Sequence, residues 1–254
     1  QSAKTWRRYC GDKMSIAAFI PLRAGGTRVG LINGLDKERA LLGGKPLMAW
    51  TIEAALESEI FNGVYAVVAS EAHAAMAAKY GAQIIRRPEY TTRPGSPDIE
   101  WVEFVLKKFR GEYWTYDAFS ILRVTSPFRT GRHIREAWNK FQGTLGADSL
   151  RAVKRVDQHP GKMWVVAGQM MYPLLPMGMG SGPEVPPWHS RATQDLFPCY
   201  IQTAGLEFAY SDVVLETHTI AGDYVVPYVL EGAAALDINT KEDWNAAERL
   251  VQPF

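Results

Sequence analysis

The sequence has 254 residues, of which 47% are hydrophobic and 22% are charged, and its formal net charge is +1. This composition argues against a disordered chain, and the net charge gives no overall attraction to nucleic acid or to an anionic membrane. Two cysteines are too few for a disulfide framework, and no apolar run approaches the roughly 20 residues of a membrane span. We therefore expect a folded cytoplasmic protein that binds neither nucleic acid nor membranes.

Residues 1–13 do not share the pattern of the rest of the chain, and we interpret them as an upstream extension or an expression-derived remnant, with a basic recognition arm as the alternative. From residue 14 to 254, short apolar runs alternate with longer amphipathic segments, which is typical of βαβ units and a mostly parallel sheet. The predicted strands cover residues 16–22, 64–69, 83–86, 118–122, 149–155, 206–210 and 224–230. The predicted helices cover residues 46–58, 71–80, 98–109, 130–141 and 240–250. This pattern predicts an α/β domain over residues 14–254.

Residues 157–200 depart from this alternation. They are rich in proline and hold five of the eight methionines, in segments such as MMYPLLPMGMGSGPEVPPWHS. Long segments of this kind in a compact domain are usually functional loops or lids. We predict an inserted lobe or lid here rather than part of the sheet core.

In the middle of the chain, a strand, a Thr-Ser-Pro turn and a basic helix start come one after another in ILRVTSPFRTGRH. Thr125 and Ser126 offer hydroxyl groups at the carboxyl end of the strand, where ligands bind in open α/β sheets. Arg123, Arg129 and Arg132 add positive charge. The segment therefore predicts an anion site, and the alternative is a helix N-cap followed by a solvated basic face.

A glycine-bearing loop comes directly after the first strand. Such a loop can turn successive backbone N–H groups and two guanidinium groups toward a polyphosphate, because glycine permits close approach and a positive φ. We interpret it as a nucleotide-binding loop, with a glycine turn that binds nothing as the alternative. Its residues are Leu22, Arg23, Gly25, Gly26, Thr27 and Arg28.

These segments resemble the N-acylneuraminate cytidylyltransferases, the enzymes that make CMP-sialic acid from CTP. The family reads LQPTSPLRT in the middle of the chain, and its opening IPARGGSKRIPRKN is followed by LLGGKPLIAYTIEAAL. This chain has IPLRAGGTRVG followed by LLGGKPLMAWTIEAAL. The resemblance covers residues 15–251 and implies a Rossmann-like three-layer sandwich of the nucleotidyltransferase type with a small inserted lobe. It also implies a homodimer in which the insert reaches toward the partner.

The resemblance implies further nucleotide-binding residues. Ser70 falls close to the position of the Ser-Thr-Asp that ends a strand in the family. The resemblance also implies that Arg87 helps to hold the cytosine. The alternative is that Arg87 is a surface arginine before a turn. The lysine of the family's loop is missing here unless Arg28 or Lys37 replaces it, and Arg is not a simple substitute for Lys. The family's Lys-Asn pair could correspond to residues 32–33 or to residues 37–38.

The closing segment ALDINTKEDWNAAERL resembles the family's DIDTPEDFELAE, whose aspartate pair supports magnesium. The pair falls on Asp237 and Asn239, so one carboxylate is replaced by an amide without charge. Mg²⁺ takes one or two carboxylates together with phosphate oxygens. Either metal binding is weaker here, or another carboxylate such as Glu207 or Asp223 helps. The alternative is that Asp237 and Thr240 simply cap the last helix.

The acceptor-binding positions depart most from the family. Its sugar-contacting glutamine, asparagine and tyrosine fall on Arg123, Thr203 and Glu207, which argues against ordinary sialic acid. Arg123 suits a compact anion such as a carboxylate, phosphonate or phosphate, and a structural salt bridge between Arg123 and Glu207 is the alternative. Lys162 resembles the lysine of the family's HHPLK, and Arg191 is displaced by two residues from its matching arginine. The predicted acceptor-binding residues are Arg123, Thr125, Ser126, Arg129, Lys162, Arg191, Thr203 and Glu207.

The resemblance thus predicts a CTP-dependent cytidylyltransferase that needs Mg²⁺. It would join CMP to a small acidic acceptor, which is an ulosonic or nonulosonic acid-like sugar or a small phosphonate or phosphate, and release pyrophosphate. Arg23, Arg28 and Asp237 are the predicted catalytic residues. A nucleotide-sugar glycosyltransferase is an alternative, but the place of its usual Asp-x-Asp motif holds Arg123-Val124-Thr125. A non-catalytic nucleotide-binding protein of the same fold is the other.

Overall fold

A computed structural model describes residues 14–23, 29–93, 95–111, 115–175 and 186–251, so the predicted extension at residues 1–13 lies outside the described part. The chain divides into two compact units. We call Gln1–Ala152 with Thr203–Phe254 the body, and Val153–Gln202 the insert. The insert predicted from composition, residues 157–200, lies inside the second unit.

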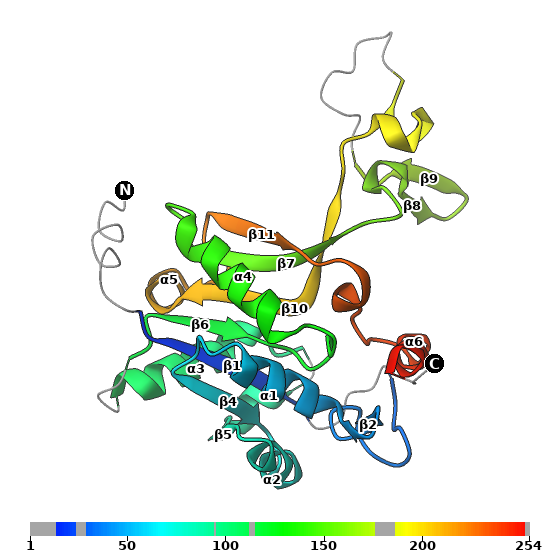
Figure 1. The fold of residues 1–254 in the computed structure, drawn as a ribbon. Helices are drawn as coiled ribbons and strands as arrows, with labels where there is room; N and C mark the ends of the chain where they lie inside the picture. The colour runs from blue at the N-terminus through cyan, green and yellow to red at the C-terminus, as the bar shows by residue number, and fades with distance from the viewer. Residues whose placement is uncertain (1–13, 24–28, 94, 112–114, 176–185, 252–254) are drawn as a thin grey trace. The chain divides into compact units, whose positions relative to one another are not determined.

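The body is built on a seven-stranded sheet with the order β11-β7-β10-β6-β1-β4-β5 (Figure 1). Its strands are β1 (Ile16–Leu22), β4 (Gly63–Val68), β5 (Gln83–Arg86), β6 (Ala118–Ile121), β7 (Ser149–Arg155), β10 (Tyr200–Tyr210) and β11 (Val225–Val229). The strands β6, β1, β4 and β5 pair in parallel, and β10 pairs antiparallel to β6. The sheet is therefore mixed, with the predicted parallel arrangement in the half that holds the first strand.

Alternation along the central strand explains the layers of the body. Ile20 of β1 packs in one hydrophobic core and Phe19 in another, because successive side chains of a strand point to opposite faces. The first core also contains side chains of α1 (Leu47–Glu57), α2 (Glu71–Lys79), α4 (Gly131–Gly143) and α6 (Lys241–Val251). The second contains side chains of α3 (Asp98–Gly111) and α5 (Ser211–Thr217). Helices thus cover both faces of the sheet, and the predicted three-layer α/β fold is confirmed.

Some elements were not predicted from the sequence. They are α5, the hairpins β2 (Leu41–Leu42) with β3 (Lys45–Pro46) and β8 (Trp164–Ala167) with β9 (Met170–Pro173), and the short 3₁₀ helices η1 (Glu89–Thr92), η2 (Pro160–Lys162), η3 (Trp188–Ser190), η4 (Thr193–Asp195) and η5 (Gly232–Ala235). All of them are too short to show a helical or strand period clearly. Strand β10 begins six residues before its predicted start, in a portion whose first three residues are exposed and so lack alternation.

The insert, taken by itself, has a small aromatic cluster and an apolar hairpin. His159, Trp188 and Phe197 make edge-to-face ring contacts at centroid distances of 5.2 to 6.2 Å. The hairpin of β8 and β9 pairs Val166 with Met171, and all eight of its residues are exposed. Trp164 of the hairpin contacts the ring of His189, but Val166, Met170, Met171 and Tyr172 are all more than half exposed.

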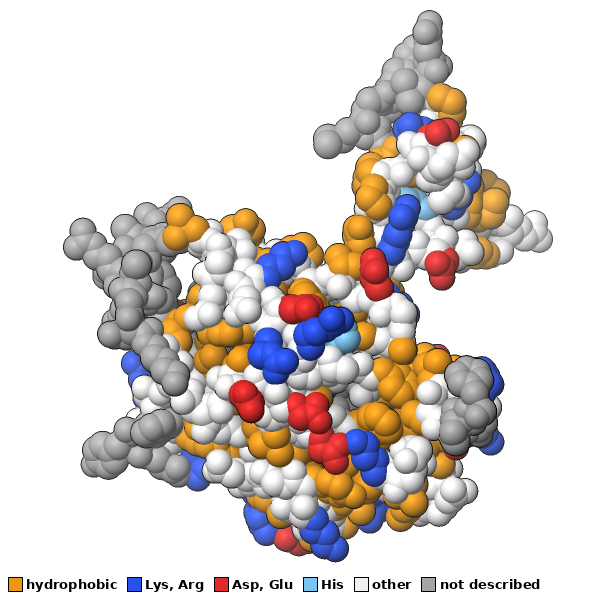
Figure 2. Space-filling model, in the orientation of Figure 1, with side chains coloured by type: hydrophobic (Ala, Val, Ile, Leu, Met, Phe, Trp, Pro, Cys, Tyr) orange, Lys and Arg blue, Asp and Glu red, His pale blue; other side chains and the backbone are white. Residues whose placement is uncertain are grey.

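The surface shows no field of a single sign on the side drawn in Figure 2. Basic and acidic side chains are interleaved over the part of the body that carries α1 and α4 (Figure 2), in keeping with the net charge of +1. Within the described ranges, no helix has the length and apolar character needed to span a membrane.

Candidate functional site

One edge of the sheet collects described residues that were predicted to bind the nucleotide or the acceptor. Arg23 directly follows β1, Ser70 follows β4, Arg87 follows β5, and Arg123 and Thr125 follow β6. Because these four strands run parallel, their carboxyl ends lie at the same edge. In open α/β sheets this is the edge at which ligands bind.

Arg23 and Arg87 bring two positive charges close together at this edge. Arg23 is exposed and donates from Nη2 to the Ser96 carbonyl oxygen at 3.1 Å. Arg87 is only 6% exposed and donates from Nε to Thr91 Oγ1 at 3.1 Å and from Nη2 to the Thr91 carbonyl oxygen. Burial, and then the charge of Arg23, lower the pKa of Arg87 to about 10. An anionic ligand would relieve the repulsion between them.

Arg123, in contrast, already has two carboxylate partners. Its Nη1 pairs with Glu207 and its Nη2 with Asp98, and the second oxygen of Glu207 pairs with Arg151. Burial alone would lower the pKa of Arg123, but the charges of Glu207 and Asp98 outweigh it and raise the pKa. The salt bridge that the sequence left open as an alternative is therefore present.

Arg129 is buried without a carboxylate partner among the described residues. It is 1% exposed, and its Nη1 donates to the carbonyl oxygens of Gly205 and Arg123. Its Nε and Nη2 have no partner in the described part of the chain. Burial lowers its pKa to about 9, so the guanidinium stays charged at neutral pH. A buried cation of this kind is costly unless an anion compensates it.

The Asp237 segment joins the same edge from the end of the chain. The Ile238 N–H donates to the Thr125 carbonyl oxygen at 2.8 Å, and Lys37 Nζ donates to the Ile238 carbonyl oxygen at 2.9 Å. Asp237 Oδ2 accepts from Asn239 Nδ2 at 2.8 Å, while its Oδ1 is buried and has no partner among the described residues. A backbone contact thus joins this segment to the Thr-Ser-Pro turn, and the ammonium group of Lys37 reaches the same segment.

Helix α6 does not depend on Asp237 for its N-cap. Thr240 Oγ1 accepts from the Asp243 N–H at 3.2 Å, and Asp243 Oδ2 accepts from the Thr240 N–H at 2.8 Å. These reciprocal bonds form a capping box. Asp237 is therefore not needed to cap the helix.

The residues around Asp237 fit one Mg²⁺ ion held by a single carboxylate. Asp237 Oδ1 and Thr125 Oγ1 are buried oxygens without a partner in the described part, and Mg²⁺ accepts such oxygen ligands together with phosphate and water. Glu207 does not supply a second carboxylate, because two arginines occupy its oxygens. Asp223 precedes β11 whereas Asp237 comes after it, so the two lie toward opposite ends of that strand.

The other predicted residues are distributed over three places. Leu22 is buried in β1, Ser126 is buried in the turn, and Thr203 is buried in β10 with an Oγ1 that lacks a described partner. Lys162 and Arg191 belong to the insert, which is described apart from the body. Gly25, Gly26, Thr27 and Arg28 lie outside the described residues.

Asp98 and Arg151 were missed by the sequence argument. Asp98 is the first residue of α3, and acidic residues are common there because they interact favourably with the helix dipole. Arg151 lies on β7, where more and less buried side chains alternate. Neither position carries a motif. Their role is evident only from the long-range pairing with Arg123 and Glu207.

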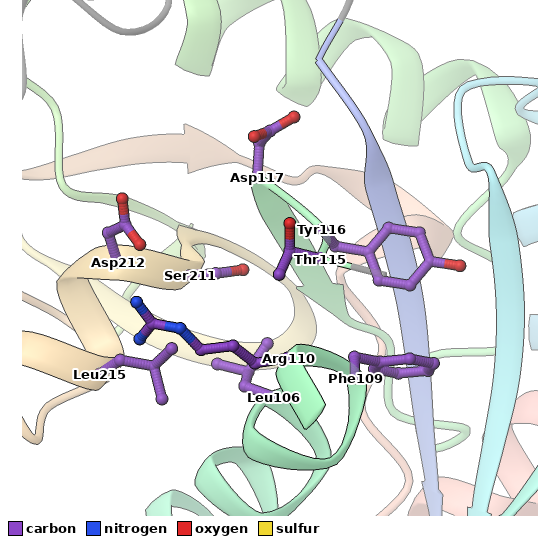
Figure 3. A pocket seen from close by; sticks show the side chains of 9 residues that line it. All are labelled: Leu106, Phe109, Arg110, Thr115, Tyr116, Asp117, Ser211, Asp212 and Leu215. Atoms are coloured by element: carbon purple, nitrogen blue, oxygen red, sulfur yellow. The ribbon is translucent and has the colours of Figure 1, made fainter. Parts of the chain in front are cut away.

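A cavity of about 270 Å³ lies at the other end of β6 (Figure 3). Thr115, Tyr116 and Asp117, which precede β6, line it together with Ser211 and other residues of α3 and α5. The side chain of Arg110 extends toward the α5 side of this cavity (Figure 3). It is therefore separate from the edge that holds Arg23, Thr125 and Asp237.

Comparison with known proteins shows which enzymes this chain is similar to. The chain is 30% identical over 241 residues to an N-acylneuraminate cytidylyltransferase of Escherichia coli O18:K1:H7, covering 94% of this chain and 53% of that protein. The chain is therefore similar over most of its length to N-acylneuraminate cytidylyltransferases. It is also 29% identical over 247 residues to a CMP-N,N'-diacetyllegionaminic acid synthase of Legionella pneumophila, covering 94% of this chain and 97% of that protein. No family model matches the chain.

The fold of this chain agrees with a solved structure of CMP:2-keto-3-deoxy-manno-octonic acid synthetase complexed with CTP. The TM-score is 0.65 at 12% identity, and the match covers 93% of this chain and 98% of that chain. The likeness shows that the two chains share the same α/β fold. The chain spans about half the length of the N-acylneuraminate cytidylyltransferase from E. coli.

Proposed function

We propose that this chain is a CTP-dependent cytidylyltransferase that joins CMP to an acidic sugar and releases pyrophosphate. The observation that carries the proposal is similarity over 94% of the chain to enzymes named for CMP transfer to acidic sugars. The body adds a physical reason, since Arg23, Arg87 and the Asp237 segment meet at the ligand-binding edge of its sheet. Cations and a carboxylate at one edge suit a nucleoside triphosphate with its metal ion.

The proposed reaction is an in-line displacement at the α-phosphorus of CTP. The hydroxyl oxygen of the acceptor forms a bond to the α-phosphorus and loses its proton to solvent. The bond between the α-phosphorus and the bridging oxygen breaks, and pyrophosphate leaves. Arg23 would neutralise the triphosphate and Arg87 would hold the base side of the nucleotide, while Lys37 stands beside Asp237 as the candidate for the missing loop lysine. Such catalysis depends mainly on positioning and charge stabilisation.

We also propose that Mg²⁺ is the cofactor and that Asp237 is its principal ligand. Bound there, the ion would neutralise phosphate oxygens and favour the leaving pyrophosphate. The support is the buried Oδ1 of Asp237, which has no partner among the described residues. Asn239 turns its amide nitrogen toward Asp237 and so orients that carboxylate rather than adding a second charge.

For the acid group of the acceptor, we propose Arg129 as the main cation instead of Arg123. Two carboxylates already neutralise Arg123, whereas Arg129 has two guanidinium nitrogens without a described partner. The buried hydroxyl of Thr203 is also without one. A carboxylate that reached these donors would make charge-assisted hydrogen bonds in a dry environment.

We propose that the active form is a cytoplasmic homodimer in which the hairpin of the insert contacts a second copy. Val166, Met170, Met171 and Tyr172 are all more than half exposed, and an apolar surface of this kind is a usual sign of an interaction site. The two cysteines and a nucleotide substrate are compatible with the reducing cytoplasm.

The test is pyrophosphate release from CTP and Mg²⁺ with a panel of acceptors. The panel contains N-acetylneuraminate, N,N'-diacetyllegionaminate, 2-keto-3-deoxy-manno-octonate and a small phosphonate. We expect release that depends on CTP and on one of the three sugar acids. Release with the phosphonate alone would replace the sugar acceptor with a phosphonate, and CTP binding without release for any acceptor would favour a non-catalytic nucleotide-binding protein.

A further inference from the structure

Three side chains next to the ligand-binding edge converge in the interior of the body. Asp36 and Glu38 lie in the segment before β2, and His73 lies in the first turn of α2. One ligand atom from each lies within 4.8 Å of the others. His73 is 1% exposed, and Asp36 and Glu38 are 8% and 6% exposed. Such a group is not a simple surface cluster of acidic residues.

His73 is held in place from both sides of its ring. Its Nδ1 lies 2.6 Å from Ser70 Oγ, and its Nε2 lies 3.2 Å from Asp36 Oδ1. Arg39 donates from Nε to the other oxygen of Asp36, Oδ2, at 2.7 Å. Oδ1 of Asp36 and Nε2 of His73 therefore face each other, and each group is oriented by a neighbour through its remaining atom.

Glu38 is the member of the group with an unsatisfied carboxylate oxygen. Its Oε2 is buried and makes no hydrogen bond with any described residue. Burial raises the pKa of Glu38, and the nearby Asp36 raises it further, while a backbone hydrogen bond and the charges of Lys37 and Arg39 offset only part of this effect. A buried carboxylate oxygen without a donor is costly, and the group contains no described donor that could satisfy it.

We propose that Asp36, Glu38 and His73 form a binding site for a divalent transition-metal ion, with Zn²⁺ as the best fit. Zinc binds imidazole nitrogen and carboxylate oxygen at about 2.0–2.2 Å, and a tetrahedral site with such bonds separates its ligand atoms by roughly 3.3 Å. The separation of His73 Nε2 from Asp36 Oδ1, 3.2 Å, already has this value. Glu38 Oε2 would supply the third ligand and a water molecule the fourth.

The neighbours of the three ligands suit this role. Ser70 would accept a hydrogen bond from His73 Nδ1, which leaves Nε2 as the metal ligand, and Arg39 would keep Oδ2 of Asp36 occupied. Such outer contacts orient metal ligands in zinc sites. Mg²⁺ and Ca²⁺ prefer oxygen ligands only, so the imidazole favours a transition metal over both. The ion would tie the segment that contains Lys37 to helix α2.

The decisive experiment measures Zn²⁺ binding by the chelator-treated full chain with isothermal titration calorimetry. We expect one equivalent to bind with micromolar or tighter affinity and no comparable Mg²⁺ signal in the absence of nucleotide. Glu38→Gln should weaken Zn²⁺ binding at least tenfold. Because the substitution replaces a buried, unpartnered carboxylate by a neutral amide of the same shape, it should leave the metal-free fold intact.

Two control variants separate this site from other candidate ligands. Cys199→Ser removes the thiol that lies 3.1 Å from His159 Nε2 in the insert, and Asp237→Asn changes the proposed Mg²⁺ ligand. Both should bind Zn²⁺ like the wild type, so the result does not depend on the proposed cytidylyltransferase activity. Loss of binding in either control, or unchanged binding in Glu38→Gln, would overturn the proposal.

A second readout is the stability and spectrum of the loaded protein. Zn²⁺ should raise the Tm of the wild type but not that of Glu38→Gln, because a ligand that binds only the folded state stabilises it. Co²⁺ in place of Zn²⁺ should give a visible d–d absorption that disappears in His73→Gln. A wild-type Tm unchanged by saturating Zn²⁺, or a Co²⁺ spectrum of the free ion, would contradict the site.

Discussion

The body and the insert differ in whether the apolar residues of their strands are buried. In β1 every residue except Pro21 is buried, and its side chains feed the cores on both faces of the sheet. In β8 and β9 of the insert every residue is exposed, although the two strands are just as apolar. Burial within the chain therefore explains the stability of the body. The exposed hairpin is the surface that we propose contacts a second copy.

The largest expected effect concerns the core of the body. Phe19 is fully buried and its ring contacts Trp101, Phe109 and Phe119. Phe19→Ala should lower the free energy of unfolding by about 3–5 kcal/mol, because it leaves a cavity in a packed core. Val166→Ala, at a position 73% exposed, should change it by less than about 0.5 kcal/mol. Urea unfolding, at a protein concentration where the chain is monomeric, measures both changes. Similar losses of unfolding free energy in the two variants would contradict the difference between the body and the insert.

A slightly smaller effect is expected from the charge network at the sheet edge. Glu207→Gln removes the common partner of Arg123 and Arg151 and should cost roughly 3 kcal/mol of unfolding free energy, because it leaves buried charge uncompensated. The matched control is Glu71→Gln, whose exposed pair with Arg86 should contribute less than about 1 kcal/mol. Thermal unfolding of both variants distinguishes them. Equal changes would mean that the network is not a structural part of the body.

The hairpin of the insert should control association. Val166 and Met171 are cross-strand partners. The double variant Val166→Asp, Met171→Asp would put two negative charges on the surface that we propose contacts a second copy. We expect the dimer dissociation constant to rise at least tenfold, about 1.4 kcal/mol, as measured by sedimentation. Tyr90→Asp, at an exposed aromatic residue of the body, is the control and should leave the dimer unchanged. A wild-type chain that stays monomeric at high concentration would refute the assembly.

The smallest effect concerns Glu38 in the metal-free protein. Burial raises the pKa of Glu38 in the folded state above its value in the unfolded state. Between these two pKa values the folded state binds more protons than the unfolded state, so the free energy of unfolding falls as the pH rises through this range. Glu38→Gln should therefore raise the Tm at pH 7, with a gain that shrinks as the pH falls below the ordinary range of glutamate. Thermal unfolding in chelator over this pH range gives the answer. A gain independent of pH would show that the charge of Glu38 is not the cause.

The sequence predicted the sheet best where local signals agree. The bounds of β1, β5 and β7 match those predicted, because apolar runs end there at turn residues or charges. Helix α5 was missed because seven residues carry too little of the helical period. The insert could be separated by its proline and methionine content, but the exposure of its hairpin could not be predicted, since burial depends on what packs against it.

The site was predictable where a residue comes directly after a strand end. Arg23, Ser70 and Arg87 lie at strand ends that the alternation of segments locates, and parallel pairing brings them to one edge. The pairing of Arg123 with Glu207 joins residues 84 positions apart and depends on the antiparallel strand β10. The group of Asp36, Glu38 and His73 was not predicted, because its spacing matches no metal motif and only the packing of α2 brings His73 to the other two.

The most direct test of the proposed activity compares Asp237→Ala with Asp223→Ala. Both remove an aspartate side chain, but Asp237 belongs to the ligand-binding edge and Asp223 lies toward the opposite end of β11. Pyrophosphate release with CTP, Mg²⁺ and the best acceptor should fall at least 100-fold in Asp237→Ala, about 2.7 kcal/mol of barrier. It should stay within about twofold of the wild type in Asp223→Ala, with unchanged Tm in both. Release by Asp237→Ala within twofold of the wild type would contradict the account.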